Sequence, residues 1–215
     1  IIECKRPDIK EPISQAISQH IRNQQEDGIR QLYVYSQLLL SVSTLHAKYA
    51  TTDTKEEFWS VWKEEKNQET EPEIQLQSVQ DEYFYHLCRP KRLLELTKDY
   101  IIFESGMFKK IARYQQYFII KKIIQRIQNI EQGRRRGGVI WHTQGSGKSL
   151  TMAMLARKIY QTIRNPKIVL VTDRVDLDTQ ITETFGKVDV PVHNAKTGNQ
   201  LVELTIGSVS NDSLS

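Results

Sequence analysis

The first part of the chain changes from strand-like to helix-like spacing of its apolar positions. Residues 1–5 read IIECK, in which alternate residues lie on the same face of a strand. Pro7 and Pro12 end that strand, and the following apolar positions predict a helix over residues 16–24. The alternation of Leu, Val and Tyr that begins at Tyr33 predicts a second strand, and the aromatic spacing in FWSVW predicts a second helix.

The middle of the chain is polar at first and amphipathic afterwards. After Lys63 the sequence EEKNQETEPE is acidic and Pro72 interrupts any helix, so a linker is predicted there. Beyond it, the apolar residues between Phe84 and Ile102 recur at helical spacing and predict a helix with one apolar face. The opposite face of this helix is expected to be solvated, and it carries Lys91, Arg92 and Lys98.

Two apolar runs in the last third of the chain are typical of buried strands. Residues 139–141 precede a loop over residues 142–147, and a helix rich in Met, Ala and Leu is predicted from Lys148 onward. The run over residues 168–171 is fully apolar and leads through polar residues into a further helix. A strand, a helix and a second strand in succession imply a parallel sheet, so we expect an α/β fold.

The loop after the first of these strands has residue types that suit phosphate binding. Gly145 and Gly147 allow backbone N–H groups to surround an anion, and the next helix directs its positive dipole end there. Lys148 would reach the β and γ phosphates of a nucleotide, while the Ser149 hydroxyl would ligate Mg²⁺. The alternative is a chance GSGKS in a flexible turn, which the flanking strand and helix disfavour. The other loop residues assigned to this phosphate site are Thr143 and Ser146.

The composition limits the possible classes of protein only loosely. The chain has 215 residues with 39% hydrophobic content, enough for one large domain or two small ones. A formal charge of +4 permits a nucleic-acid partner without requiring one. The two cysteines form no CxxC pair, and no apolar run is long enough for a membrane span, so a cytoplasmic protein is expected. The opening IIECKRPD has no initial Met and no signal sequence, which suggests part of a longer polypeptide.

The first strand also carries a charge pair with possible chemistry. Glu3 and Lys5 lie one residue apart, so both side chains lie on one face of the strand. An E-x-K pair is the second half of the PD-(D/E)xK nuclease signature, in which the Glu ligates Mg²⁺ and the Lys polarises water or the scissile phosphate. A strand edge with alternating charges explains the same residues, and the pair alone does not decide between the two.

The text that follows E-x-K resembles the restriction (R) subunit of type I restriction-modification enzymes. That family places a glutamine-bearing helix, a YSQLLL-type strand, an A-x-Y-x-T-T-x-T turn and an FWxxW helix in this order, and the sequence matches nearly throughout. The resemblance implies that Gln19 belongs to the nuclease site with Glu3 and Lys5. It also implies a tyrosine where this chain has Asn23, and a metal-binding Asp upstream of residue 1.

The same resemblance assigns roles in the last part of the chain. His142 stands where GxxxxGK[ST] has its first glycine, and superfamily 2 helicases and translocases often lack that glycine. The Arg-Tyr-x-Gln pattern falls on Arg113, Tyr114 and Gln116, and implies that the Gln116 amide reads adenine; a surface glutamine is the alternative. The resemblance implies that a further segment contacts the DNA backbone. This segment could equally be a solvated loop and the start of a helix capped by Asp176. Its residues are Thr172, Asp173, Arg174, Leu177 and Gln180.

A basic patch before the phosphate loop has two interpretations that the sequence leaves open. It could contact DNA phosphates or form a solvated loop, and Glu131 is the acidic residue that offsets it. Its basic members are Lys121, Lys122, Arg126, Arg134, Arg135 and Arg136.

The resemblance extends to about Leu204 and implies three parts. These are the end of a restriction-endonuclease-like nuclease domain over residues 1–64, a linker and connector helix over 65–105, and the start of a RecA-like motor domain over 106–215. For the parent protein it implies ATP-driven translocation of double-stranded DNA coupled to Mg²⁺-dependent cleavage, in complex with methyltransferase (M) and specificity (S) subunits and with S-adenosylmethionine.

Two other classes of function stay open from the sequence alone. One is a different superfamily 2 helicase or repair ATPase with a vestigial nuclease domain, and the other is a fragment that only binds. No DEAH-type motif is present, and a Mg²⁺ ion at Glu3 has one carboxylate from this stretch. The chain by itself is therefore expected to be inactive both as an ATPase and as a nuclease.

Overall fold

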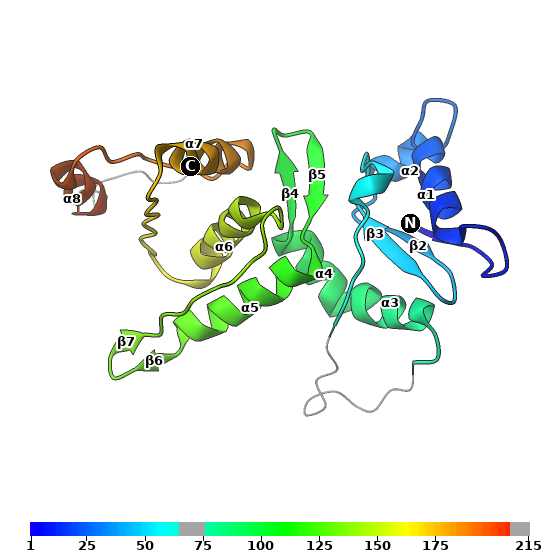
Figure 1. Ribbon diagram of the computed structural model, residues 1–215, viewed down its shortest axis with the longest axis horizontal. Helices are drawn as coiled ribbons and strands as arrows, with labels where there is room; N and C mark the ends of the chain where they lie inside the picture. Colours follow the sequence, from blue (N-terminus) through cyan, green and yellow to red (C-terminus); the bar gives the residue numbers. More distant parts are fainter. Residues whose placement is uncertain (65–75, 207–215) are drawn as a thin grey trace. The chain divides into compact units, whose positions relative to one another are not determined.

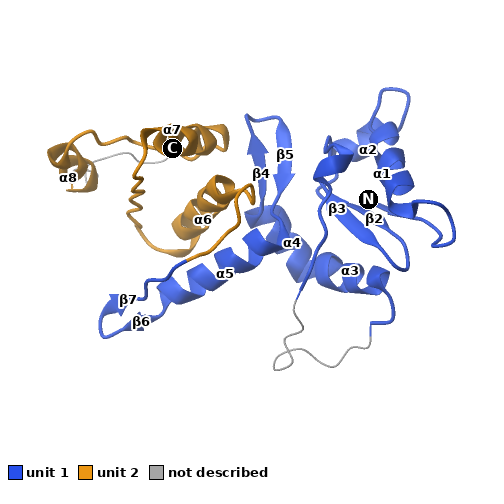
Figure 2. Cartoon of the chain, in the orientation of Figure 1, with its two compact units in different colours: residues 1–139 blue, residues 140–215 orange. Residues whose placement is uncertain are grey.

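The computed structural model describes residues 1–64 and 76–206 and separates the chain into two compact units (Figures 1 and 2). Unit 1 comprises residues 1–139, and unit 2 comprises residues 140–215. Much of the predicted linker, with Pro72, lies outside the described residues. The fold is mixed α/β with small sheets, which confirms the predicted α/β class but not its detailed arrangement.

Unit 1 begins with a three-stranded sheet covered by a helix. Strand β1 (Ile2–Cys4) pairs in parallel with β2 (Leu39–Val42), which pairs antiparallel with β3 (Ala47–Ala50). Helix α1 (Pro12–Asn23) crosses from β1 to β2 and starts with proline, which suits the first helical turn because its missing N–H has no partner there. The first strand and first helix predicted from the sequence are confirmed. Their shared core consists of Ile17, Tyr33, Leu39, Ala50 and Trp59.

Of the two further elements predicted before the linker, the strand is confirmed only in part, as β2, and the FWSVW helix is wrong. Tyr33 lies in a short helix, α2 (Arg30–Val34). FWSVW contributes only Phe58 to a 3₁₀ turn, η1 (Glu56–Phe58), and the backbone is extended at Trp59. Ser60 pairs with Tyr49 of β3, so the open edge of the sheet draws this segment into an extended conformation. The first half of the expected A-x-Y-x-T-T-x-T turn is likewise strand β3.

The aromatic residues of this region divide between core and surface. Tyr33, Trp59 and Trp62 are buried, as expected for core residues. Tyr35 is 83% exposed and Phe58 is 57% exposed, so these two are not part of the core.

The predicted connector helix is two helices and the start of a hairpin. Helix α3 (Val79–Cys88) is capped by Ser78, whose Oγ accepts from the Asp81 N–H at 3.1 Å. Helix α4 (Pro90–Asp99) then begins at a proline, because Pro90 cannot donate a hydrogen bond to the preceding turn. The apolar residues at 101 and 102 belong to β4 (Ile101–Glu104), which pairs antiparallel with β5 (Phe108–Ile111).

Arg92 is buried, so its predicted place on a solvated face is wrong, whereas Lys91 and Lys98 are exposed. Its guanidinium donates two hydrogen bonds of 2.9 Å to the two carboxylate oxygens of Glu64. It also lies 4.7 Å from the centre of the Tyr117 ring, within the range of a cation–π contact. This buried pair joins the chain before the linker to the helices after it.

The Glu64 carboxylate is held in its charged form by its neighbours. Burial raises the pKa of Glu64, but contacts from His86, Arg92 and Trp62 outweigh burial, and the pKa lies far below its ordinary value. His86 Nδ1 lies 3.1 Å from a Glu64 oxygen, and the Trp62 indole N–H donates to the same oxygen at 3.1 Å. The carboxylate is thus approached from three different segments of unit 1.

Unit 1 ends in a long helix and a short hairpin. Helix α5 (Tyr114–Gln128) packs through Tyr117, whose ring centre lies 4.6 Å from that of Tyr100. The hairpin strands are β6 (Ile130–Glu131) and β7 (Arg134–Arg135). The Tyr49 hydroxyl donates to the Ala112 carbonyl at 2.9 Å and so ties the first sheet to the start of α5.

Unit 2 contains helices α6 (Lys148–Thr162), α7 (Val175–Lys187) and α8 (Gly198–Ile206), and α6 packs on α7. The helix predicted from Lys148 onward is confirmed. Within the described residues, neither of the two predicted buried strands forms a strand or pairs with one, so the expected parallel sheet is absent there. Val139, Trp141 and Val171 are 96%, 90% and 88% exposed. A strand needs a neighbour that completes its hydrogen bonds, and neither apolar run has one in this part of the chain.

Arg92→Met should destabilise unit 1 by about 3–5 kcal/mol, because it leaves the Glu64 carboxylate buried without its cation. The measurement is urea unfolding of the chain followed by tryptophan fluorescence. Lys98→Met on the exposed side of α4 is the matched control and should stay within about 0.5 kcal/mol of the wild type.

The double variant Glu64→Gln with Arg92→Met should recover part of the lost stability, since no buried charge remains. The depressed pKa of Glu64 also means that its contribution is present above its unfolded pKa and is lost as pH falls toward the folded value. Equal stability of wild type and Arg92→Met at neutral pH would contradict the role of the pair.

Candidate nuclease and nucleotide sites

The structure brings together the three residues predicted for the nuclease site. Lys5 Nζ lies 2.9 Å from Glu3 Oε1 and donates a 2.6 Å hydrogen bond to Gln19 Oε1. The Lys5 and Glu3 side chains are each 21% exposed, so the cluster is half-buried but open to solvent. The Lys5 ammonium is therefore held between the Glu3 carboxylate and the Gln19 amide.

Local geometry explains how Gln19 reaches the strand. The Lys5 N–H donates to the Val42 carbonyl at 2.9 Å, so the alternation of β1 continues to Lys5 and keeps its side chain on the Glu3 face. The buried Ala16 and Ile17 hold α1 against the sheet. Gln19 is half-buried at the edge of this contact, within reach of Lys5.

His20 is a site neighbour that sequence reasoning missed. Its Nε2 lies 3.1 Å from the Leu40 carbonyl, which can only accept, so Nε2 carries the hydrogen. Nδ1 then accepts from the Tyr33 hydroxyl at 2.9 Å, and the ring stacks on Trp59 with centres 5.3 Å apart. Burial lowers the pKa of His20 and favours this neutral form. The signal was its spacing: His20 falls three residues after Ile17, on the buried face of α1.

Asn23 stands where the family has a tyrosine, and a tyrosine from another element lies beside it. Burial raises the pKa of Tyr33, and a side-chain hydrogen bond with Asn23 lowers it in part. The Tyr33 hydroxyl therefore connects Asn23 to His20, and through His20 to β2. This chain of hydrogen bonds fixes α1, and with it Gln19, on the sheet.

The described residues offer little to a metal ion. Among residues 1–64 and 76–206, no group of three or more His, Cys, Asp or Glu side chains is placed to hold one. Glu3 supplies a single carboxylate, whereas Mg²⁺ takes about six oxygen ligands. Glu3 is thus the metal-ligand candidate in the nuclease cluster, and the residues present do not complete a site.

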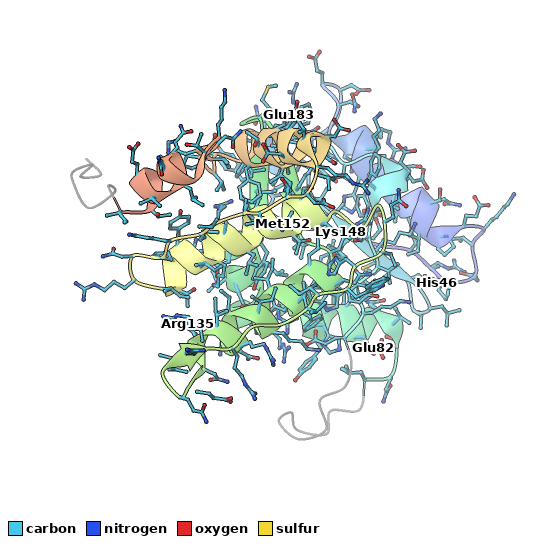
Figure 3. The ribbon with its side chains drawn as sticks, turned by 60° about the vertical axis from the view of Figure 1, so that its left-hand side comes forward. His46, Glu82, Arg135, Lys148, Met152 and Glu183 are labelled. Carbon is cyan, nitrogen blue, oxygen red and sulfur yellow. The ribbon has the colours of Figure 1, made fainter. Side chains whose placement is uncertain are left out.

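The phosphate loop has the backbone expected of an anion site. Gly145 and Gly147 have φ of 74° and 80°, the left-handed region that glycine tolerates and that the nest of N–H groups requires. Gly147 caps α6, and Figure 3 shows Lys148 at the first turn of that helix with Met152 one turn further on. The Lys148 side chain is exposed and Ser149 is half-buried at the same helix end.

The His142 and Ser146 side chains make contacts within the phosphate loop. The Ser146 hydroxyl donates to the Thr143 carbonyl at 2.7 Å and lies 3.3 Å from His142 Nδ1. His142, which stands in place of a glycine, thus contacts the loop through its side chain.

The residues assigned to adenine recognition lie at the start of α5 in unit 1. Gln116 is 3% exposed, so the alternative of a surface glutamine is wrong. Its Oε1 accepts from the Arg113 backbone N–H at 2.9 Å, which satisfies a helix-end donor, while the Arg113 side chain is exposed. Gln115, the less favoured choice, is exposed.

The residues assigned to the DNA backbone surround the start of α7. Arg174 is the residue before the first turn, and Asp176 lies inside that turn, so the cap role considered for Asp176 is wrong. Asp173, Arg174 and Gln180 are exposed, and Thr172 is half-buried.

No helix among the described residues is long and apolar enough to span a bilayer.

Two family models match separate stretches of the chain. The profile described as "Type I restriction enzyme R protein N terminus" matches residues 1–58, and the profile described as "SWI2/SNF2 ATPase" matches residues 115–213.

Relatives among curated proteins match most of the chain. The type I restriction enzyme HindI endonuclease subunit of Haemophilus influenzae is 35% identical over 75% of this chain and 16% of its own length. The putative MjaIXP endonuclease subunit of Methanocaldococcus jannaschii is 28% identical over 95% of this chain and 21% of its own. The SauCOLORF180P endonuclease subunit of Staphylococcus aureus is 27% identical over 86% and 19%. The chain thus spans about a fifth of these relatives.

Tyr33→Phe should destabilise unit 1 by about 1–3 kcal/mol, because His20 Nδ1 loses its donor while staying buried. Urea unfolding measures the change, and Tyr35→Phe at the exposed neighbouring position is the matched control with no expected effect. Nitrogen-15 spectra of the histidines should show His20 protonated on Nε2 only. A resonance from a protonated Nδ1 in the wild type would refute the assigned tautomer.

Proposed function

Since the chain belongs to the family of type I restriction enzyme R subunits, we propose that it is part of a subunit that couples ATP-driven DNA translocation to Mg²⁺-dependent double-strand cleavage. The observation that carries the proposal is the Lys5 ammonium held between Glu3 and Gln19, in one chain with a phosphate loop that starts α6. The chain spans about a fifth of its relatives, so these activities are proposed for the parent protein.

The motor role rests on the loop before α6. The loop N–H groups and the Lys148 ammonium would surround the phosphates of ATP, and the left-handed glycines support this because they fit the backbone nest. The Ser149 hydroxyl would hold the Mg²⁺ that accompanies the nucleotide. Gln116 and Arg113 are the proposed contacts to the adenine side. The loop residues proposed to bind phosphate are Thr143, Gly145, Ser146, Gly147 and Lys148.

The nuclease role rests on the cluster at β1. Lys5, oriented by Gln19, would place its positive charge beside the scissile phosphate, and Glu3 would contribute one oxygen to Mg²⁺. A bound Mg²⁺ would supply Lewis acidity there, but the described residues do not complete its shell. We therefore assign to this chain the positioning of the phosphate and one metal ligand only.

The proposed partners follow from the family. They are double-stranded DNA, the M and S subunits, and S-adenosylmethionine as a requirement of the whole complex. DNA backbone contacts are proposed at the start of α7, from Thr172, Asp173, Arg174 and Gln180. A second candidate, a superfamily 2 DNA motor with a vestigial nuclease, is favoured by Asn23, which stands in place of the family's tyrosine.

Lys148→Ala in the full-length subunit should abolish ATP hydrolysis and translocation, because the charge on the β and γ phosphates loses its counter-ion. The Lys148 side chain is exposed at the start of α6, so the fold should be retained. Lys158→Ala, on the same helix but away from the loop, is the matched control and should hydrolyse ATP normally. Unchanged turnover in Lys148→Ala would overturn the motor assignment.

Glu3→Ala or Lys5→Ala in the full-length assembly should stop DNA cleavage and leave ATP hydrolysis intact, since the two reactions use separate sites. Lys10→Ala, at an exposed position after the strand, is the control with normal cleavage expected. Cleavage at the wild-type rate in both variants would mean that the pair is a strand edge, and would favour the motor with a vestigial nuclease.

A further inference from the structure

The β6–β7 hairpin carries Arg134 and Arg135 of the basic patch, and it contains none of the site residues named under the proposed function. It follows α5 directly, and its strands pair Ile130 with Arg135 and Glu131 with Arg134 (Figure 1). Its two turn residues, Gln132 and Gly133, both have positive φ, of 50° and 75°. Two positive values in a two-residue turn are typical of the tight hairpin turn that matches strand twist. The chain therefore forms a defined, solvent-exposed hairpin here.

Two arginines fasten the hairpin to the end of α5. The Arg135 guanidinium donates to the Ile127 carbonyl at 2.6 Å, and Arg126 Nε donates to the Gly137 carbonyl at 2.5 Å. A cation at the carboxyl end of a helix also interacts favourably with the helix dipole. Figure 3 places Arg135 on the hairpin beside α5. The direction of the hairpin is thus set by side-chain contacts within unit 1.

The face of the hairpin opposite Arg135 presents a guanidinium group for binding. Strand alternation places Arg134 and Arg136 on that face together with Glu131. Arg136 Nε lies 2.7 Å from Glu131 Oε2, so this carboxylate is already paired. Within the described part of the chain, Arg134 makes no ion pair, and its residue is exposed. Arg134 is therefore available to an anionic partner.

The surroundings of the hairpin add to its positive potential. Residues 121–137 contain six basic side chains and one acidic one, and residues 130–140 are all exposed. Outside this stretch, Glu95 also offsets the patch, because its carboxylate lies 3.7 Å from Lys121 Nζ. Residues 121–137 contain no aromatic residue on which an unpaired base could stack. The chemistry suits phosphates of a duplex better than a single strand.

We propose that the β6–β7 hairpin is a contact to the phosphate backbone of duplex DNA, with Arg134 as its principal ligand. That the partner is duplex DNA rests on the proposed function. The hairpin adds a binding element outside the residues assigned at α7. An arginine fork binds a phosphate through two parallel hydrogen bonds and reads no base, so the contact is independent of DNA sequence.

The test is fluorescence anisotropy of a labelled duplex with the 215-residue chain over a series of salt concentrations. Arg134→Gln should weaken binding several-fold on any sequence and reduce the slope of log affinity against log salt by about one. Arg164→Gln, which removes the same charge from an exposed position in unit 2, is the matched control and should change neither quantity.

Glu131→Gln provides a variant that misfolding cannot imitate. It removes the carboxylate that pairs with Arg136, and should therefore strengthen duplex binding and steepen the salt slope. No duplex binding by the wild type, no effect of Arg134→Gln and Glu131→Gln, or tighter binding of a single strand than of the duplex would each overturn the proposal. None of these results touches ATP hydrolysis or its loss in Lys148→Ala, so the motor assignment stands or fails separately.

Discussion

The buried pair of Glu64 and Arg92 is the constraint on which the arrangement of unit 1 depends. Once the guanidinium is enclosed by the aromatic rings of Trp62 and Tyr117, it must have a carboxylate, because an unpaired buried charge costs several kcal/mol. Glu64 supplies that carboxylate, and its pairing with Arg92 holds the chain after β3 against α4. The pair therefore specifies which surfaces meet, more than it adds to net stability.

The same segment connects this constraint to the nuclease cluster. The extended residues that lead to Glu64 carry Trp59, whose ring stacks on His20, and Ser60, which pairs with β3. His20 in turn fixes α1 to β2 through the Leu40 carbonyl, so that Gln19 meets Lys5. The half-buried Lys5 ammonium is thus positioned, through Gln19 and His20, by core residues such as Trp59 that lie far from it in the sequence.

The phosphate loop follows a different physical logic. Its form depends on neighbouring residues: two glycines in the left-handed region, a serine that bonds back to Thr143, and a helix that starts at Lys148. The apolar runs on either side of the loop and helix are largely exposed, and in the described chain they pair with no strand. The local backbone of the loop is therefore formed even where the described residues lack the sheet expected around it.

The sequence by itself determined what local rules decide. The E-x-K alternation, the helix after Pro12, the glycine loop and the start of α6 all follow from spacing and from backbone preferences of single residues. Tertiary structure decided the rest: that Arg92 is buried, that FWSVW is extended, that Tyr33 lies in a helix, and that His20 supports Gln19. Each of these depends on a partner distant in sequence, and helical periodicity cannot reveal which open strand edge or buried charge a segment will meet.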